Sequence, residues 1–355
     1  MSTKSISKLF LIFVLFFVQN LKAFTQEEGS DFNPTDMIMH HIQDSYDWHF
    51  FDLGETSVTL SLPVILKTDQ GWITFMSSAF HHDSEGGVVV EKEGQRVVNY
   101  HEKAYVLNEG ETALEFGEDH YPNNAVRPLD LSITKNVASI FLSVIVLLLL
   151  FPRLASHYKK SDKAPKGLNN ALETLVIFVR DDIARPQIGE KKFMKFMPFL
   201  LTVFFFIWVT NLLGLLPGAA NVTGSISVTV ALGLITLLLM IFNGTKDYWK
   251  HIFWMPGVPV PVRILLAPIE LVGLFIKPIA LMIRLFANIT AGHIIILSLI
   301  GLIFILSSAG VAFISVPFAL FISVLELLVA FLQAFIFTML SALFIGMAVE
   351  EHEHH

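Results

Sequence analysis

The stretch LFIKPIALMIRLFANITAGHIIILSL, residues 274–299, places a permanently charged side chain, Arg284, inside a run apolar enough to lie in a membrane. A charge at the centre of a bilayer costs on the order of several kcal/mol. Arginine cannot avoid this cost by losing its proton. The residues around Arg284 therefore carry most of the information about the fold class and the function.

The composition of the whole chain agrees with a membrane location. Of its 355 residues 54% are hydrophobic and only 15% are charged, whereas soluble domains contain about 25% charged residues. This indicates a polytopic, all-α membrane protein rather than a soluble enzyme. The chain contains no cysteine, which excludes disulfides, thiolate metal sites and cysteine nucleophiles. We expect no cofactor, no metal and no nucleic-acid partner.

The first 23 residues predict a signal peptide. Lys4 and Lys8 precede a short apolar stretch, Leu9 to Val18, and Ala23 ends an acceptable cleavage site. Ten apolar residues are too few to span a bilayer. Removal of residues 1–23 is therefore favoured over the alternative, a helix that stays in the mature chain.

Residues 24–134 form an acidic segment with 20 Asp and Glu against 5 Lys and Arg. The sequence SVTLSLPVIL (57–66) alternates like a strand, and GVVVEKEGQRVVNY (87–100) predicts a hairpin that turns at Glu-Gly. An earlier piece, PTDMIMHHIQDSYDWHFF (34–51), predicts a helix. We therefore expect a separate segment that contains β structure.

Two histidine pairs in this segment, His40-His41 and His81-His82, raise the question of a metal site. Neighbouring side chains on a strand point to opposite faces. A solvated surface is therefore favoured over metal binding for both pairs.

Charge asymmetry orients the first predicted span, residues 136–154. The loop that follows, residues 152–195, contains ten Lys and Arg against five Asp and Glu. Basic loops of this kind stay in the cytoplasm. The acidic segment before the span is then periplasmic, in agreement with a signal peptide, and we expect the cell inner membrane as the location.

Two further features of the membrane part follow from polarity. Residues 166–186 are amphipathic with flanking charges, which predicts an in-plane helix at the cytoplasmic face. Residues 199–245 contain no charged side chain and predict two spans joined by the turn GAANVTGSI.

The last apolar part, residues 264–349, is long enough for four ordinary spans. Its one loop-like interruption is SSAG, residues 307–310. A helix of about 45 residues measures about 67 Å, whereas the hydrocarbon core is about 30 Å thick. We therefore predict two long, strongly tilted helices, and this arrangement places the C-terminus in the cytoplasm.

The first of these helices carries a polar stripe. Glu270, Lys277 and Arg284 recur every seven residues, which returns to nearly the same helix face, and Asn288 lies one turn beyond Arg284. A structural ion pair of Glu270 with Lys277 is an open alternative to a functional role for these two residues. It does not account for Arg284.

The second helix carries Glu326 and Gln333, again seven residues apart. His293 lies nine residues after Arg284, about half a rotation away, and should face a different neighbour, the last helix. Ionisable residues inside membranes mark ion pathways or counter-ions. One fixed cation with a few titratable groups suits proton movement better than solute transport.

Three segments resemble a known family. The quoted stretch 274–299 and LELLVAFLQAFIFTMLSALFIGMAVEEH (325–352) resemble the two signature segments of subunit a of the F-type ATP synthase. FIWVTNLLGLLPG (206–218) resembles an earlier span of the same family. The resemblance covers about residues 134–352 and implies a membrane domain over residues 135–355. It does not explain the acidic segment.

The resemblance implies that Arg284 is the stator arginine facing the ring of c subunits, with Asn288 and Gln333 as its polar neighbours. It also implies two partner groups besides membrane lipid: the c-subunit ring and the b-subunit stator stalk of the F-type ATP synthase complex. The chain would be a non-catalytic channel subunit, since it contains no nucleotide motif.

The same resemblance assigns Glu270 and Lys277 to the cytoplasmic approach, and His293 and Glu326 to the outer half-channel. Some relatives have Glu at the first position of this outer pair and His at the second. A carboxylate–imidazole pair survives that exchange, so contact between His293 and Glu326 is expected. The alternatives are a stand-alone secondary ion antiporter or channel and a membrane anchor for the acidic segment. The sequence shows no internal repeat of the kind common in antiporters.

Overall fold

The computed structural model describes Ile38 and residues 42–350, except 54–55, 118–120, 161–165, 217, 256 and 307–308. The proposed signal peptide and the His40-His41 pair lie outside these residues. The chain divides into two compact units. The first comprises residues 1–139, 216–220 and 304–307, and the second comprises residues 140–215, 221–303 and 308–355.

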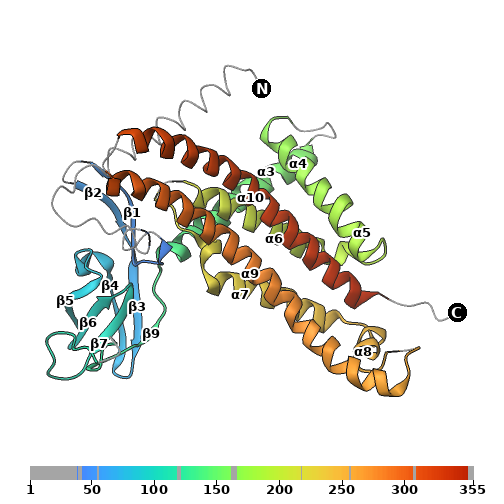
Figure 1. Ribbon diagram of the computed structural model, residues 1–355, viewed down its shortest axis with the longest axis horizontal. Helices are drawn as coiled ribbons and strands as arrows, with labels where there is room; N and C mark the ends of the chain where they lie inside the picture. The colour runs from blue at the N-terminus through green and yellow to red at the C-terminus, as the bar shows by residue number, and fades with distance from the viewer. Residues whose placement is uncertain are drawn as a thin grey trace. The chain divides into compact units, whose positions relative to one another are not determined.

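The first unit is built from short antiparallel strands in three sheets, ordered β1-β2, β4-β3-β9 and β5-β6-β7-β8 (Figure 1). The single 3-10 turn between β4 and β5 is η1, Ser77–Phe80. The strands are β1 Asp47–Leu53, β2 Thr56–Ser61, β3 Pro63–Thr68, β4 Gly71–Met76, β5 Glu85–Lys92, β6 Gln95–Tyr100, β7 Lys103–Leu107, β8 Ala125–Val126 and β9 Leu129–Asp130.

Inward-facing side chains of these strands form the core of the first unit. Along β3, Val64 and Leu66 are fully buried, and Ile73 of β4 faces them. This alternation is the period-2 pattern expected of a sheet with one buried face. The β structure predicted for the acidic segment is therefore confirmed.

The strand predictions hold with corrections. The hairpin 87–100 is confirmed, since β5 and β6 pair and turn at Glu93-Gly94. The run 57–66 forms two strands, because β2 ends before Leu62 and β3 begins at Pro63. Proline has no backbone N–H to donate to a neighbouring strand, and the first residue of a strand tolerates this. The predicted helix 34–51 is wrong from residue 43 onward: residues 43–46 are not helical, and β1 pairs with β2 from Asp47. Pairing with β2 overrides the local helical pattern there. Of the earlier part of the predicted helix, only Ile38 and residue 42 are among the described residues.

The second unit contains the apolar helices, and its first helix begins in the first unit. The helices are α3 Lys135–Lys160, α4 Leu168–Phe178, the π-helix η2 Val179–Ala184, α5 Arg185–Ile188, α6 Phe193–Gly214, the 3-10 helix η3 Val222–Gly224, α7 Ile226–Asn243, α8 Lys246–Phe253, α9 Val260–Leu306 and α10 Ala309–Val349.

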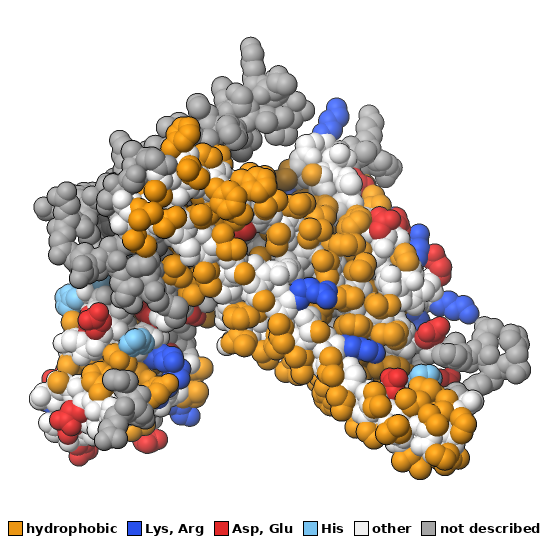
Figure 2. All heavy atoms as spheres, in the orientation of Figure 1, with side chains coloured by type: hydrophobic (Ala, Val, Ile, Leu, Met, Phe, Trp, Pro, Cys, Tyr) orange, Lys and Arg blue, Asp and Glu red, His pale blue; other side chains and the backbone are white. Residues whose placement is uncertain are grey.

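Five helices of the described chain are long and apolar enough to cross a membrane: α3, α6, α7, α9 and α10. The spans predicted at residues 136–154 and within 199–245 are thus present as α3, α6 and α7. Figure 2 shows that hydrophobic side chains dominate the exposed surface of the long helices, with few charged ones between them. A surface of this kind is suited to lipid or to other membrane-embedded chains.

The two long helices predicted for residues 264–349 are present. α9 has 47 residues and α10 has 41, which corresponds to lengths of about 70 and 62 Å. Each continues through internal prolines, at positions 268 and 278 in α9 and 317 in α10. The absence of turn residues in the sequence was therefore a correct indication that this part does not form four short spans.

α9 and α10 run side by side in opposite directions (Figure 1). Two contacts fix their register: Lys277 Nζ lies 5.8 Å from the ring centroid of Phe344, and His293 Nδ1 lies 3.7 Å from Glu326 Oε1. Interpolating between these pairs places Gln333 level with about residue 287 of α9.

α10 also packs against α6, α7 and α5 in the core of the second unit. Between α7 and α10, the hydroxyls of Thr236 and Ser341 lie 3.3 Å apart, both buried. Small and hydroxyl-bearing residues at such interfaces let helices approach closely and bond to each other in an apolar medium.

The amphipathic segment predicted at residues 166–186 is helical, formed by α4, η2 and α5. Its apolar side joins the same core through Leu172, Val179 and Ile183. Its charged side is partly exposed; there the Asp181 carboxylate accepts a hydrogen bond from Arg180 and forms an ion pair with Arg185. These features suit an in-plane helix, and that orientation stays a prediction.

Gly346 marks the closest approach of α10 to α5. A Cβ at this position would lie 2.9 Å from the carbonyl carbon of Gln187 and 3.4 Å from Cα of Ile188, both backbone atoms that cannot rotate away. Only glycine fits there without separating the two helices.

Gly346→Ala is therefore expected to lower the free energy of unfolding by about 1–3 kcal/mol, the usual cost of overpacking. Thermal unfolding of the purified chain in detergent measures this. Gly273→Ala in α9 is the matched control, because a Cβ there meets nothing within 4 Å. Equal stability of the two variants would contradict the packing described here.

Candidate functional site

Arg284 lies on an open face of α9. Positions that are exposed recur every three to four residues along the middle of this helix, and the buried positions, among them Leu281, Leu285 and Ile289, form the opposite face. Between residues 275 and 291 the exposed positions are Phe275, Ile276, Ile279, Ala280, Ile283, Arg284, Ala287, Asn288 and Ala291. The predicted placement of Asn288 on the side of Arg284 is thus observed.

Among the described residues, no carboxylate lies within ion-pair distance of Arg284. Asn288 is the polar residue that shares its face, one turn away. A guanidinium that projects from an apolar helix without an internal counter-ion is available to a charge on another molecule.

Glu326 and Gln333 face the opposite way, into the second unit. Their exposed fractions are 6% and 3%, and both lie on the inner face of α10. The predicted common face of the two residues is observed. The register of the two helices puts Gln333 at the height of Arg284 and Asn288, although Gln333 is buried and the other two are exposed.

His293 and Glu326 meet, as expected. The distance from His293 Nδ1 to Glu326 Oε1 is 3.7 Å, and the side chains are 20% and 7% exposed. Glu326 Oε1 has no hydrogen-bond partner within the described chain. A buried carboxylate oxygen without a donor is costly.

Gly292 makes the position of Glu326 possible. A Cβ on Gly292 would collide with the Glu326 carboxylate and would lie 2.9 Å from its Cδ and 3.0 Å from its Cγ. The carboxylate therefore occupies the space that a larger residue at 292 would fill. The sequence showed an isolated glycine here, but not the side chain that uses its space.

Gly292→Ala is expected to push the Glu326 side chain away from His293 without changing any titratable group. If the pair carries protons, as the resemblance implies, proton flux across native membranes should fall about tenfold, since a displacement of about 1 Å can cost a reaction step up to about 100-fold. Proton flux across membrane vesicles measures this, with Gly273→Ala on the same helix as the control. Equal proton flux in both variants would show that Gly292 has no role in proton conduction.

Glu270 and Lys277 do not form the structural ion pair that the sequence left open. Lys277 instead lies over the Phe344 ring, a cation–π contact between α9 and α10. Glu270 lies near α8, where burial and then the Glu270 charge raise the pKa of Tyr248. Both residues are half-buried and lie in the first half of α9, before Arg284.

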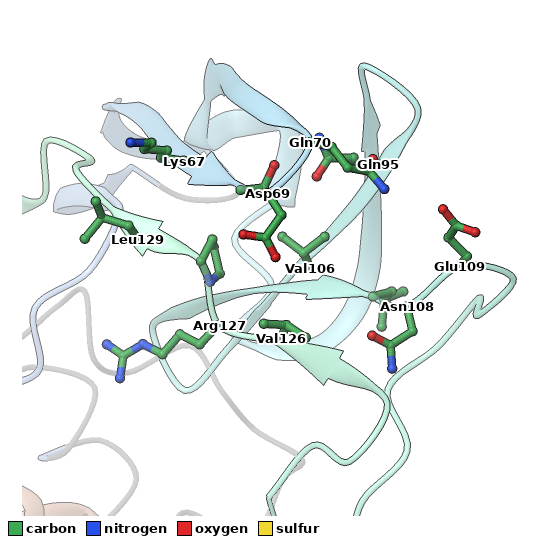
Figure 3. Close-up of a pocket in the computed structure, with 13 residues that line it drawn as sticks. Lys67, Asp69, Gln70, Gln95, Val106, Asn108, Glu109, Val126, Arg127 and Leu129 are labelled. Carbon is green, nitrogen blue, oxygen red and sulfur yellow. The ribbon is translucent and has the colours of Figure 1, made fainter.

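The first unit has a separate hollow of about 450 Å³ beneath the crossing from β8 to β9 (Figure 3). Its rim mixes the cations Lys67 and Arg127 with the carboxylates of Asp69 and Glu109. This mixture favours no single kind of ligand.

The second histidine pair lies at the surface of the same unit. His81 and His82 are both exposed, and His82 Nδ1 is 3.1 Å from Asp47 Oδ2. Among the described residues, no group of three or more His, Asp or Glu is placed to hold a metal ion.

Comparison with known proteins finds one family that matches the membrane part of the chain. The profile of the family described as ATP synthase A chain matches residues 137–346. The chain belongs to this family. ATP synthase family membership makes it a multi-pass membrane subunit of that complex, consistent with the five apolar helices.

Individual relatives cover more of the chain than the family profile does. ATP synthase subunit a 2 of Chlorobaculum tepidum is 47% identical over 75% of this chain and 76% of its own length. ATP synthase subunit a of Pelodictyon phaeoclathratiforme is 43% identical over 84% of this chain and 94% of its own. That of Anaeromyxobacter sp. is 40% identical over 92% of this chain and 74% of its own.

The acidic segment is accordingly not peculiar to this chain. The match to the Anaeromyxobacter subunit over 92% of the chain must include most of it. A second profile, described only as a domain of unknown function, matches residues 37–131. This range coincides with the strands of the first unit.

Proposed function

We propose that the chain is the proton-translocating stator subunit of the F-type ATP synthase, with two half-channels that lead to the carboxylates of a rotating c-subunit ring. The observation that carries the proposal is the division of polar groups between two faces. Arg284 and Asn288 lie on the open face of α9, and the titratable pair His293–Glu326 is enclosed between α9 and α10.

The outer half-channel uses the enclosed pair. A proton from outside passes Glu326 and His293, whose side chains can each take up and release a proton. It then neutralises a carboxylate of a passing ring subunit. A neutral carboxyl enters lipid at far lower cost than a carboxylate does, so the ring rotates with this subunit facing the lipid.

Arg284 separates the two half-channels. Its positive charge favours the ionised form of the ring carboxylate, so the proton leaves towards the cytoplasm after nearly a full rotation. Because arginine keeps its own proton, it cannot pass one directly between the channels. The open face of α9 leaves this charge accessible to a ring packed against the helix.

The remaining polar residues have supporting roles. Asn288, on the same face as Arg284, orients the guanidinium without neutralising it. The resemblance implies the same role for Gln333, which here is buried on α10 at the height of Arg284 and faces away from it. Glu270 and Lys277 lie on the cytoplasmic approach, through which the proton leaves. Each proton releases about 2.3 kcal/mol per 100 mV of membrane potential, and rotation couples this energy to ATP synthesis on other subunits.

The membrane arrangement completes the proposal. A helix of about 70 Å must incline strongly to fit a hydrocarbon core of about 30 Å. We place residues 24–134 in the periplasm after removal of residues 1–23, the basic loop 152–195 and the C-terminus in the cytoplasm, and the spans in the inner membrane. The b-subunit stalk is the expected second partner within the complex.

Purification through an affinity tag on this chain, from its native membranes in mild detergent, tests the proposal. The chain should bring with it a small ring-forming subunit, a stalk subunit and a soluble ATPase. Isolation of the chain alone, active in ion exchange, would favour the stand-alone antiporter instead. ATP synthesis measured against sodium concentration at fixed pH then identifies the coupling ion.

A further inference from the structure

The segment Asp44–Phe50 of the first unit contacts two other parts of the chain that are far away in sequence. One is the beginning of α3, at residues 134–136, and the other is the connection from α6 to α7, residues 216–220. Both parts belong to the first unit by their contacts, although they begin and connect membrane-type helices.

The beginning of α3 is capped by this segment. The carboxylate of Asp44 accepts from the backbone N–H of Asn136 at 3.0 Å and from the hydroxyl of Thr134 at 2.8 Å. The backbone N–H of Lys135 donates to the carbonyl of Ser45 at 2.9 Å. The first N–H groups of a helix have no partner inside it, so a segment some 90 residues away satisfies them.

The α6–α7 connection is held by the other end of the segment. Trp48 is 8% exposed, and its indole Nε1 donates to the carbonyl of Gly218 at 2.8 Å. Gly218 has φ +74°, and a Cβ there would lie 2.9 Å from the Phe50 carbonyl oxygen and 3.0 Å from that of His49. Two backbones thus touch with no room for a side chain.

Between these two contacts the segment is fixed to the core of its own unit. Tyr46 is 3% exposed; its hydroxyl donates to Asp130 Oδ2 of β9 and accepts from the Ala104 N–H of β7 at 3.0 Å. Burial, followed by the bond to Asp130, raises the pKa of the Tyr46 hydroxyl, which favours the neutral donor. Three successive anchors therefore leave this segment little freedom.

We propose that the segment Asp44–Phe50 is a strap, by which the first unit holds the beginning of α3 and the α6–α7 connection at a fixed separation. This gives the segment a structural task within the first unit, where it joins the beginning of α3 to the α6–α7 connection. It is independent of the proposed proton pathway, because it requires none of the charged residues of α9 and α10.

The absence of cysteine from the chain allows a direct test in the intact complex in native membranes. Phe50→Cys with Ala219→Cys puts thiols on the two sides of the Gly218 contact, and a short bifunctional maleimide should join them in most copies of the chain. Glu93→Cys with Ala219→Cys is the control pair, because Glu93 is in the exposed β5–β6 turn.

A second change distinguishes the close contact from backbone strain. Gly218→Ala in the Phe50/Ala219 background should lower the yield of cross-link about fivefold or more, as a change of about 1 kcal/mol in an equilibrium does. Gly94→Ala imposes the same strain at φ +76° but meets nothing within 4 Å, so it should leave the yield unchanged.

Trp48→Phe keeps an aromatic ring and removes the bond to Gly218, and it should also lower the yield. Trp72→Phe, at a position that is 51% exposed, should not. Equal cross-linking of the two cysteine pairs, or a yield that Gly218→Ala and Gly94→Ala affect alike, would overturn the strap. Cross-linking requires no proton transport, so its outcome does not depend on the proposed function.

Discussion

Arg284→Ala is expected to abolish both ATP synthesis and ATP-driven proton pumping, while the chain still inserts and assembles. Arg284 is exposed and has no carboxylate partner within the described chain, so its removal breaks no internal ion pair. In the proposed mechanism, what is lost is the charge that makes a ring carboxylate release its proton and that blocks direct passage between the half-channels.

ATP-driven acidification of inverted membrane vesicles, with equal amounts of complex confirmed by immunoblot, measures this loss. Arg284→Lys should not restore coupling well, because lysine can lose its proton and lacks the rigid guanidinium fork. Arg263→Ala is the control on the same helix; Arg263 lies over the Trp254 ring, with its Cζ 4.4 Å from the centroid. Normal coupled pumping by Arg284→Ala would refute the role of this arginine.

Glu326→Gln is expected to reduce proton flux at least about 100-fold, the lower end of what a positioned proton-transfer group contributes. Glutamine has nearly the same shape, and it still fits the space beside Gly292. Glutamine cannot take up and release a proton, so the proposed proton path from the outer side through His293 is interrupted. Assembly should change far less than flux does.

The measurement is passive proton flux through vesicles from which the soluble ATPase has been removed, compared at equal content of the chain. Glu190→Gln is the matched control, since the Glu190 carboxylate is 72% exposed and lies beside Arg185. Flux through Glu326→Gln at the wild-type level would remove Glu326 from the pathway. It would leave the role of Arg284 untouched.

Periodicity made much of the membrane part predictable. The lack of turn residues between positions 264 and 307 indicated α9, and a single helix is what the structure contains. The seven-residue spacing of Glu326 and Gln333 correctly placed both on one face. Such inferences succeed because the period of an α-helix is fixed by backbone geometry and does not depend on distant residues.

Contacts between distant residues could not be predicted in this way. The sequence shows Gly292 as an isolated glycine and does not indicate that the Glu326 carboxylate lies against it. Likewise, whether Lys277 contacts Glu270 or the Phe344 ring depends on the register of α9 and α10. The strand β1 replaced a predicted helix because its partner β2, and not its own sequence, decides its conformation.

The central claim is that the open face of α9 around Arg284 meets a ring of carboxylate-bearing subunits. Cysteine introduced by Ile283→Cys or Ala287→Cys, in the otherwise cysteine-free chain, tests it most directly when a thiol-reactive photo-crosslinker is attached in native membranes. We expect an adduct with the small ring subunit from both positions and none from Ile235→Cys on α7, which is 45% exposed. Labelled chain that forms no adduct with a ring subunit from either position on α9 would contradict the account.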